Sequence, residues 1–348
     1  MPGVASAGES TEIGPCERSP LAELAFGETA DRREPARSRH LAFMPADTPL
    51  LDLKDPDQRH FGGYELLELL GSGGTGTVYR ARQAALDREV ALKLLAAGPW
   101  ASREFIRRFE HEARYAARME HPNIVTVYDV GCHEEIHFYS MRLVRGRSLS
   151  ARLRSGEHFS PEAAARLVRT VAGALEYAHG MGVLHLDLKP SNVLVDANGV
   201  PHVSDFGLAR QLQGTPVIDN DELSGTPTYM APEQAVVHAY KLSAATDVWA
   251  LGAILYELVA GRPPFRGDSV GETLDMVLEG HVREPSRFAP ALPRDLEAII
   301  CKCLYKDAVQ RYQTARALHE DLTRFLEGRL VHARRLNLLQ RGLHWMLR

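Results

Sequence analysis

The chain has 348 residues, of which 45% are hydrophobic and 25% are charged, and its formal net charge is −4. This length suits two ordinary domains or one large two-lobed domain, and the composition is that of an ordinary globular protein. The slightly acidic balance argues against nucleic-acid binding, which favours a strongly basic surface. We therefore expect no nucleic-acid partner.

Targeting signals are not visible in the sequence. The first thirty residues lack the apolar core of a secretory signal, and the longest apolar run, residues 248–261, is interrupted by Glu257 and too short to span a bilayer. The four cysteines, Cys16, Cys132, Cys301 and Cys303, form no CxxC pair and no zinc spacing. We expect reduced thiols, a cytoplasmic location and no transmembrane span.

Residues 1–60 are rich in Pro, Ala, Gly, Glu and Arg and show no sustained period, which predicts a disordered N-terminal extension. Order is expected to begin at residue 61, where alternating apolar residues indicate strands. The expected strands are residues 64–70, 77–83, 89–95, 123–130 and 137–144. With a helical segment at 101–119, they predict a five-stranded antiparallel sheet plus one helix in a lobe spanning residues 61–145.

From residue 146 to residue 328 the pattern is mostly helical. Residues 161–180 start with a proline and repeat apolar residues at helical spacing, and residues 315–328 also repeat apolar residues at this spacing and stop at Gly328. The predicted fold class is therefore α+β, with a small sheet-containing lobe followed by a larger, mainly α-helical lobe.

The last segment, residues 329–348, has five arginines and no acidic residue. As a helix it would be amphipathic and basic, so a peripheral contact with an anionic membrane, docking of a partner, and packing on the preceding lobe all stay open.

A glycine-rich run at residues 70–78 contains Gly71, Gly73 and Gly76. Glycines allow backbone amides to approach phosphate oxygens closely. Dinucleotide-binding folds use the same spacing, but there the glycines lead into a helix and an acidic residue follows about 20 positions later. Here they lead into Thr77 and Val78, and no acid stands near position 96, which disfavours that alternative.

A lysine stands in an apolar strand at VALK, residues 90–93. Burial of an unpaired ammonium group is unfavourable, so Lys93 needs a partner. The following helix offers Glu110 and Glu112, and the spacing alone does not choose between them.

Acidic and amide side chains follow at spacings suited to phosphoryl transfer. In HLDLKPSN, residues 185–192, Asp187 can accept a hydroxyl proton, Lys189 can neutralise phosphoryl charge, and Asn192 can ligate Mg²⁺. Asp205 of DFG follows 13 residues after Asn192, and its carboxylate can chelate Mg²⁺ as well.

From about residue 64 to 327, the chain resembles the eukaryotic-like Ser/Thr protein kinases that are widespread in bacteria. The motifs that carry this resemblance are GSGGTG (71–76), VALK (90–93), HLDLKPSN (185–192), DFG (205–207), GTPTYMAPE (225–233), DVWALG (247–252) and DAVQRY (307–312). The resemblance implies a bilobal fold that binds ATP and Mg²⁺ between the lobes.

The resemblance also implies roles for individual residues. The catalytic set would be Lys93, Glu112, Asp187, Lys189 and Thr226. The Mg²⁺ ligands would be Asn192 and Asp205. Structural contacts would be made by Asp247, beneath the catalytic loop, and by Arg311 with Glu233. The residues expected to contact ATP are Leu70, Gly71, Ser72, Gly73, Gly74, Thr75, Gly76, Thr77, Val78, Ala91, Lys93, Met141, Val144 and Leu194.

The resulting functional hypothesis is an active kinase that phosphorylates Ser and Thr residues of protein substrates, including itself. The alternative is a pseudokinase that serves as a nucleotide-binding scaffold, although Lys93, Glu112, Asp187, Asn192 and Asp205 are all present. A small-molecule kinase is disfavoured by the peptide-binding segment GTPTYMAPE. Homodimerisation stays open.

One position departs from the family pattern: Leu186 stands where arginine usually precedes the catalytic aspartate. A leucine cannot bind phosphate, so we expect activity without phosphorylation of the activation segment. Arg210, shortly after DFG, is the residue that could bind a phosphate of the activation segment in place of the missing arginine. The candidate acceptors in the segment are Thr215, Ser224, Thr226 and Thr228.

Overall fold

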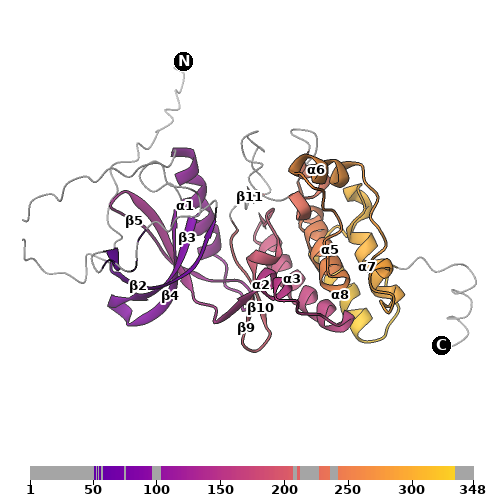
Figure 1. Ribbon diagram of the computed structural model, residues 1–348, viewed down its shortest axis with the longest axis horizontal. Helices are drawn as coiled ribbons and strands as arrows, with labels where there is room; N and C mark the ends of the chain where they lie inside the picture. Colours follow the sequence, from indigo (N-terminus) through magenta and orange to yellow (C-terminus); the bar gives the residue numbers. More distant parts are fainter. Residues whose placement is uncertain are drawn as a thin grey trace, which may run out of the picture. The chain divides into compact units, whose positions relative to one another are not determined.

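The computed structural model describes residues 51, 53, 55, 58–73, 76–95, 103–206, 210–211, 227–235 and 242–333. The chain divides into two units, one made of Met1–Ile106 and Tyr128–Met141, the other of Arg107–Val127 and Arg142–Arg348. The first unit contains a six-stranded sheet and the second is largely helical (Figure 1). The predicted α+β class is therefore confirmed.

The sheet of the first unit has the strand order β1-β2-β3-β4-β6-β5. Its strands are β1 (His60–Phe61), β2 (Tyr64–Gly73), β3 (Gly76–Gln83), β4 (Arg88–Leu95), β5 (Val127–His133) and β6 (Ile136–Arg142). The first four pair antiparallel in sequence order. Alternate residues of these strands form an apolar core, because successive side chains of a strand point to opposite faces. The core consists of Phe61, Tyr64, Leu66, Tyr79, Ala81, Val90, Leu92, Leu94 and Phe138.

Apart from shifts of a few residues at strand ends, the sheet differs from the prediction in one additional strand and in the start of another. The two-residue strand β1 was not expected, because a pair of residues carries no detectable period. Strand β5 begins at Val127 instead of residue 123. The preceding residues bond elsewhere: the N–H of Val125 donates to the carbonyl of Val203 (2.8 Å), and the N–H of Val203 donates to Asn123 (2.8 Å).

Contacts with the sheet core extend to Leu51, within the segment predicted to be a disordered extension. The side chains of Leu51 and Leu53 pack against the core. The hydroxyl of buried Tyr79 accepts from the N–H of Leu51 (3.1 Å) and donates to its carbonyl (3.2 Å). Residues 1–50 lie outside the described residues. The domain limits at residues 60 and 328 stay predictions.

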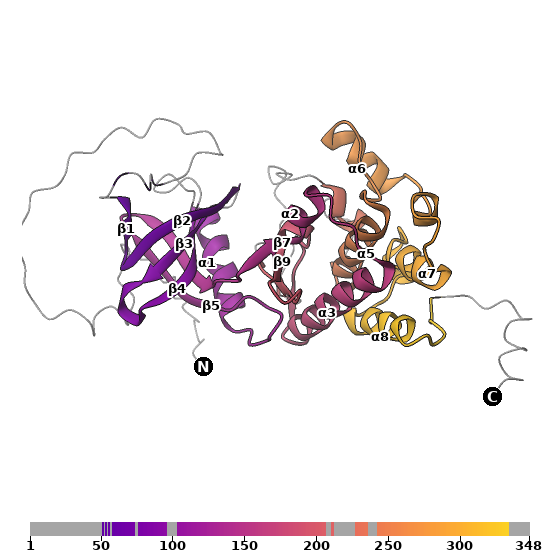
Figure 2. The same ribbon diagram turned by 60° about the horizontal axis from the view of Figure 1, so that its bottom comes forward.

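Helix α1 (Arg103–Ala117) follows β4 in the chain and falls mostly in the second unit, and the remaining helices come after β6. They are α2 (Leu149–Arg154), α3 (Pro161–Gly180), α4 (Pro232–Ala235), α5 (Ala244–Ala260), α6 (Val270–Leu278), α7 (Arg294–Cys303) and α8 (Ala315–Leu326). Within this unit α5 is central and packs against α3, α7 and α8 (Figures 1 and 2). Gly252 permits the approach to α7, because a Cβ at that position would lie 2.3 Å from the Cβ of Cys303.

Helix starts follow local signals in the sequence. Helix α3 spans Pro161–Gly180 as predicted, with Ser160 accepting a hydrogen bond from the N–H of Ala163 (3.2 Å). Helix α5 begins after a capping box formed by Ser243 and Thr246. These polar side chains satisfy backbone N–H groups that have no partner inside the helix.

Short strands of the second unit position the loops that carry the candidate chemistry. Strand β9 (Val193–Asp196) pairs with β7 (Gly146–Ser148) and with β10 (Pro201–Val203). Strand β8 (Val183–Leu184) pairs with β11 (Arg210–Gln211). The predicted catalytic loop therefore leaves β8 and enters β9 through a 3-10 helix, Pro190–Asn192.

The end of the described chain lies against α8. The carboxylate of buried Asp321 accepts from the N–H groups of His332 (2.6 Å) and Ala333 (2.8 Å), and Val331 is buried. The rest of the predicted basic helix, residues 334–348, lies outside the described residues. Among the described helices, none combines the length and apolar character needed to cross a membrane.

The cysteines correct one expectation. Cys301 and Cys303 are free thiols, and burial raises the pKa of Cys301 to about 11. Cys132, however, is disulfide-bonded, so the expectation of four reduced thiols is wrong. Sequence spacing could not show this, because disulfide pairing depends on which cysteines the tertiary structure brings together.

Candidate active site

The predicted catalytic loop brings three polar side chains of residues 187–192 together. The ammonium group of Lys189 donates to both carboxylate oxygens of Asp187, at 3.1 Å and 2.8 Å. The side-chain amide of Asn192 donates to the backbone carbonyl of Asp187 (2.8 Å) and to its carboxylate (3.3 Å). The Asp187 carboxylate is thus held in a defined orientation while remaining partly exposed.

A buried carboxylate holds the backbone of this loop. One oxygen of Asp247, in α5, accepts from the N–H of His185 (2.9 Å) and the other from the N–H of Leu186 (2.8 Å). The Nε2 atom of His179 lies 2.7 Å from the same carboxylate. Burial acts to raise the pKa of Asp247, but the contacts with His179 and His185 outweigh it and hold this pKa below its usual range.

The segment that carries Asp205 is joined to the catalytic loop. The N–H of Ser204 donates to the carbonyl of Asn192 (2.9 Å), and Nε2 of His185 lies 3.1 Å from the carbonyl of Ser204. The rings of His185 and buried Phe206 lie 4.6 Å apart. These contacts place the backbones of Asn192 and Asp205 side by side.

The donor set at these two residues fits Mg²⁺. The NH₂ end of Asn192 donates to Asp187, so its Oδ1 atom, which also accepts from the hydroxyl of Ser191 (3.2 Å), is the atom that would ligate the metal, and Asp205 supplies a carboxylate. Amide and carboxylate oxygens are ligands that Mg²⁺ takes, and this ion usually completes its shell with water and substrate phosphates. Within the described residues no group of three or more His, Cys, Asp or Glu side chains could hold a metal on its own.

Strands β2, β3 and β4 carry the glycine-rich turn and Lys93. Cross-strand pairs align Gly71 with Val78 and Gly73 with Gly76. Gly76 cannot be replaced without a shift of the backbone, because a Cβ there would lie 2.2 Å from the carbonyl oxygen of Leu94. Gly74 and Thr75 lie outside the described residues.

Lys93 is buried, with 3% of its surface exposed, and pairs with Val78 across the sheet. Its ammonium group lies 5.5 Å from the centre of the Tyr139 ring, within reach of a cation–π interaction. Of its two candidate partners, Glu110 lies 3.5 Å from Arg114 one helical turn away. The side chain of Glu112 lies outside the described residues, so its pairing with Lys93 stays a prediction.

Of the other residues expected to contact ATP, Leu70, Ala91, Met141 and Leu194 lie on strands, whereas Val144 lies in the loop between β6 and β7. Ala91 and Met141 are buried in the sheet unit, and Leu70 there is exposed. In the helical unit Leu194, on β9, is aligned with Ser148 and His202.

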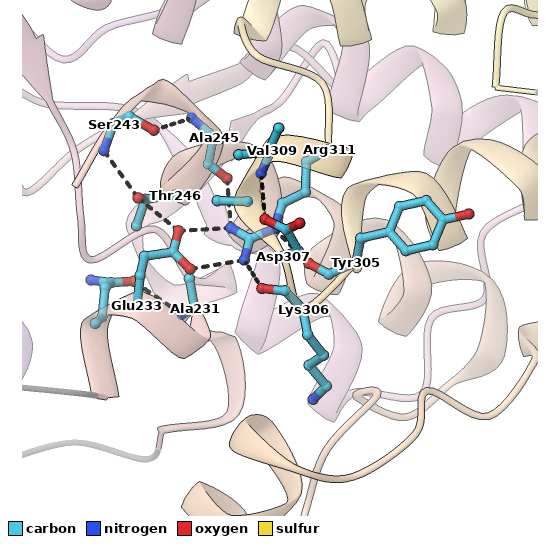
Figure 3. A network of polar contacts seen from close by, with 12 residues as sticks. Ala231, Glu233, Ser243, Ala245, Thr246, Tyr305, Lys306, Asp307, Val309 and Arg311 are labelled. Atoms are coloured by element: carbon cyan, nitrogen blue, oxygen red, sulfur yellow. Dashed lines mark hydrogen bonds and ion pairs between the residues drawn. The ribbon is translucent and has the colours of Figure 1, made fainter. Parts of the chain in front are cut away.

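A buried ion pair ties α4 to the segment between α7 and α8 (Figure 3). The guanidinium group of Arg311 contacts both oxygens of Glu233, at 2.7 Å and 2.8 Å. It also donates to the carbonyls of Tyr305, Ala245 and Lys306. The contact that the resemblance implied between Glu233 and Arg311 is therefore present.

Similarity to known proteins decides the family of this chain. The sequence model of the protein kinase domain matches residues 64–323, well over half of the chain. The chain belongs to the protein kinase domain family. Its expected membership of the bacterial serine/threonine kinases is likewise confirmed by the relatives found.

Serine/threonine-protein kinase PrkC of Bacillus subtilis (strain 168) is 36% identical over 278 residues, which cover 80% of this chain and 43% of PrkC. Serine/threonine-protein kinase PknB of Mycolicibacterium smegmatis is 38% identical over 277 residues, which cover 78% of this chain and 44% of PknB. The chain thus spans less than half the length of these curated relatives.

Several residues of the kinase domain take part in the site without having been singled out from the sequence. His179 contacts Asp247 from the end of α3, and Gln234 donates to the carbonyl of Leu186 (2.7 Å). A histidine in the last turn of an apolar helix and a glutamine beside Glu233 were the available signals, and both were too common to be informative. Thr226 lies outside the described residues.

Proposed function

We propose that this chain is an active protein kinase that transfers the γ-phosphoryl group of ATP to serine and threonine hydroxyls of protein substrates, itself included. The observation that carries the proposal is the orientation of Asp187. The backbone of the two residues before it, His185 and Leu186, is held by Asp247, and its carboxylate is held by Lys189 and Asn192.

In this role Asp187 would accept the proton of the acceptor hydroxyl and align its oxygen for attack. Lys189, 2.8 Å from that carboxylate, would face the charge on the transferred group. Mg²⁺, when bound with ATP, neutralises charge on the phosphates, and Asn192 and Asp205 are the residues of this chain that would hold it. Lys93 would hold the nucleotide phosphates from the sheet unit.

The serine and threonine specificity is supported by the sequence resemblance and by the names of the relatives, both serine/threonine-protein kinases. The proposal includes a cytoplasmic location, since that compartment supplies ATP.

The test combines an activity assay with two variants. Purified protein incubated with Mg²⁺ and ATP should incorporate phosphate into itself and a generic protein, with phosphoserine or phosphothreonine identified by mass spectrometry. We predict that Asp187→Asn and Lys93→Met each lower kcat by about 10²–10⁴-fold, because positioning and charge stabilisation dominate this reaction. Asp268→Asn, at an exposed aspartate, is the matched control and should retain wild-type activity.

Two outcomes would contradict the proposal. Retention of more than about a tenth of the wild-type rate by Asp187→Asn would remove Asp187 from its assigned role. Nucleotide-dependent stabilisation of a wild-type protein that transfers no phosphate would favour the pseudokinase alternative.

A further inference from the structure

Leu186, directly before Asp187, has an unusual backbone conformation. Its φ angle is +62°, in the left-handed region that is unfavourable for a leucine, and its side chain is buried. Such a conformation persists only where surrounding contacts determine it. Because Leu186 sets the direction in which the chain enters Asp187, the contacts that hold Leu186 also place the Asp187 carboxylate.

Both polar backbone groups of Leu186 are bound. Its N–H donates to Asp247 (2.8 Å), and its carbonyl accepts from the side-chain NH₂ of Gln234 (2.7 Å). The Leu186 carbonyl and the Asp187 N–H belong to one peptide plane, since a peptide bond is planar. Gln234 therefore holds the peptide plane that carries the Asp187 N–H, whereas Asp247 holds the preceding plane, which carries the Leu186 N–H.

Gln234 is itself fixed at its other end. Its Oε1 atom accepts from the N–H of Ala231 (3.1 Å), and its own N–H donates to the Ala231 carbonyl (2.9 Å). The preceding residue, Glu233, is bound to Arg311 in the buried ion pair. The side-chain amide thus connects an anchored helix, α4, to the catalytic loop.

We propose that Gln234 is a positioning residue for phosphoryl transfer: through the Leu186 carbonyl it keeps the Leu186–Asp187 peptide in the orientation that aims Asp187 at the acceptor hydroxyl. The inference rests on the proposed kinase function. It also gives α4 a means of controlling catalysis through the backbone of Leu186, whose apolar side chain offers no hydrogen bond.

The decisive variants are Gln234→Met and Gln234→Glu. Methionine has a similar length but no hydrogen-bond donor, so Gln234→Met should lower kcat about tenfold at every pH. KM for ATP should stay within about twofold of the wild-type value, because the substitution misplaces Asp187 and not the residues that bind the nucleotide. Glutamate keeps the shape, but its ionised form cannot donate to the Leu186 carbonyl and repels it. A protonated glutamic acid has an O–H that can donate again.

The pH dependence separates positioning from mere stability. At pH 8 the kcat of Gln234→Glu should be about tenfold lower than that of the wild type at the same pH. The ratio of the two kcat values should then rise about threefold toward pH 5, as the carboxyl group of the variant takes up a proton. The Gln234→Met ratio should not change with pH. Gln310→Glu and Gln310→Met, at an exposed glutamine of the same unit, are the matched controls and should behave as wild type.

Each outcome bears on the inference. An active wild type with both Gln234 variants within about twofold of its kcat overturns the positioning role alone. A Gln234→Glu deficit that is constant with pH and equal to a loss of folded protein, measured by thermal unfolding, also overturns it. An inactive wild type overturns the proposed function and this inference with it.

Discussion

Two arginine–glutamate pairs in the helical unit differ chiefly in burial. The side chains of Arg311 and Glu233 are 0% and 6% exposed, whereas those of Arg316 and Glu320 are 71% and 56% exposed. Removal of one partner from a buried pair leaves an uncompensated charge, while an exposed partner is hydrated and screened. The closest N–O distances, 2.7 Å and 2.9 Å, therefore do not imply similar contributions to stability.

We predict that Arg311→Met and Glu233→Gln each destabilise the protein by about 3–5 kcal/mol, which corresponds to a fall in Tm of about 10 °C or more. Arg316→Met should change stability by less than about 0.5 kcal/mol. Thermal and urea unfolding measure both effects. A buried-pair variant with wild-type stability would show that relaxation or water compensates the remaining charge.

Lys306, whose carbonyl accepts from Arg311, carries a second charge that is partly buried. Its ammonium group donates to the carbonyls of Met276 (2.9 Å) and Val277 (2.5 Å) at the end of α6 and lies 3.9 Å from the centre of the Phe265 ring. Burial, followed by the charge of Arg311, lowers the pKa of Lys306 to about 8. The unfolded chain keeps this proton up to about pH 10.4.

Between pH 8 and about pH 10.4 the unfolded state therefore binds more protons at this residue, so Lys306 makes stability rise with pH over that window. Below pH 8 both states are protonated and the dependence vanishes. We predict that Lys306→Met and Lys306→Arg both lose this rise, by roughly 2 kcal/mol relative to wild type across the window. Urea unfolding at several pH values tests this, and an unchanged slope in both variants would refute the assignment to Lys306.

At the scale of elements, both ends of the activation segment are attached within the helical unit. Strand β11 pairs with β8 at one end, where Arg210 is aligned with Leu184. At the other end Tyr229 donates to Glu257 of α5 (2.5 Å). Thr228, one of the four candidate acceptors, is 3% exposed and therefore inaccessible to a kinase in this conformation. The other three candidates and the side chain of Arg210 lie outside the described residues.

We predict that the kinase is active without phosphorylation of this segment, because Leu186 offers no positive charge whose repulsion a phosphate would relieve. Initial rates on a generic peptide should change by no more than a few-fold when the enzyme is fully dephosphorylated. The same should hold for the double variant that combines Thr215→Ala with Ser224→Ala. A fall of about a hundredfold, reversed by autophosphorylation of the dephosphorylated enzyme, would contradict this prediction and show that phosphorylation of the segment controls the kinase.

At the scale of the whole molecule, the contacts of Leu51 and Leu53 revise the expected effect of truncation. From composition alone, removal of residues 1–58 should leave folding unchanged. Those two leucines, however, pack on the sheet core, and Leu51 exchanges two hydrogen bonds with Tyr79.

We therefore predict that removal of residues 1–50 changes Tm by no more than about 1–2 °C, whereas removal of residues 1–58 destabilises the protein by about 2–3 kcal/mol. Differential scanning fluorimetry of the two truncated proteins provides the comparison. Equal Tm values would show that the contacts of residues 51–58 contribute nothing.

Features governed by neighbouring residues could be predicted from the sequence. Helix α3 has the predicted bounds because a serine cap, a proline and an apolar period all lie within one segment. The spacing of Asp187, Lys189 and Asn192 likewise suffices to predict a joint site, since five residues of chain cannot separate them far. The pairing of Glu233 with Arg311 came from the family resemblance, because 78 residues separate them.

The tertiary structure alone decided which distant groups meet. The start of β5 depends on bonds to Val203, the disulfide at Cys132 depends on proximity, and the lowered pKa of Lys306 depends on its burial and on the charge of Arg311. Gln234 reaches Leu186 across 48 residues of chain. No local period or propensity encodes such a contact, because it forms only after packing has brought the two segments within hydrogen-bonding distance.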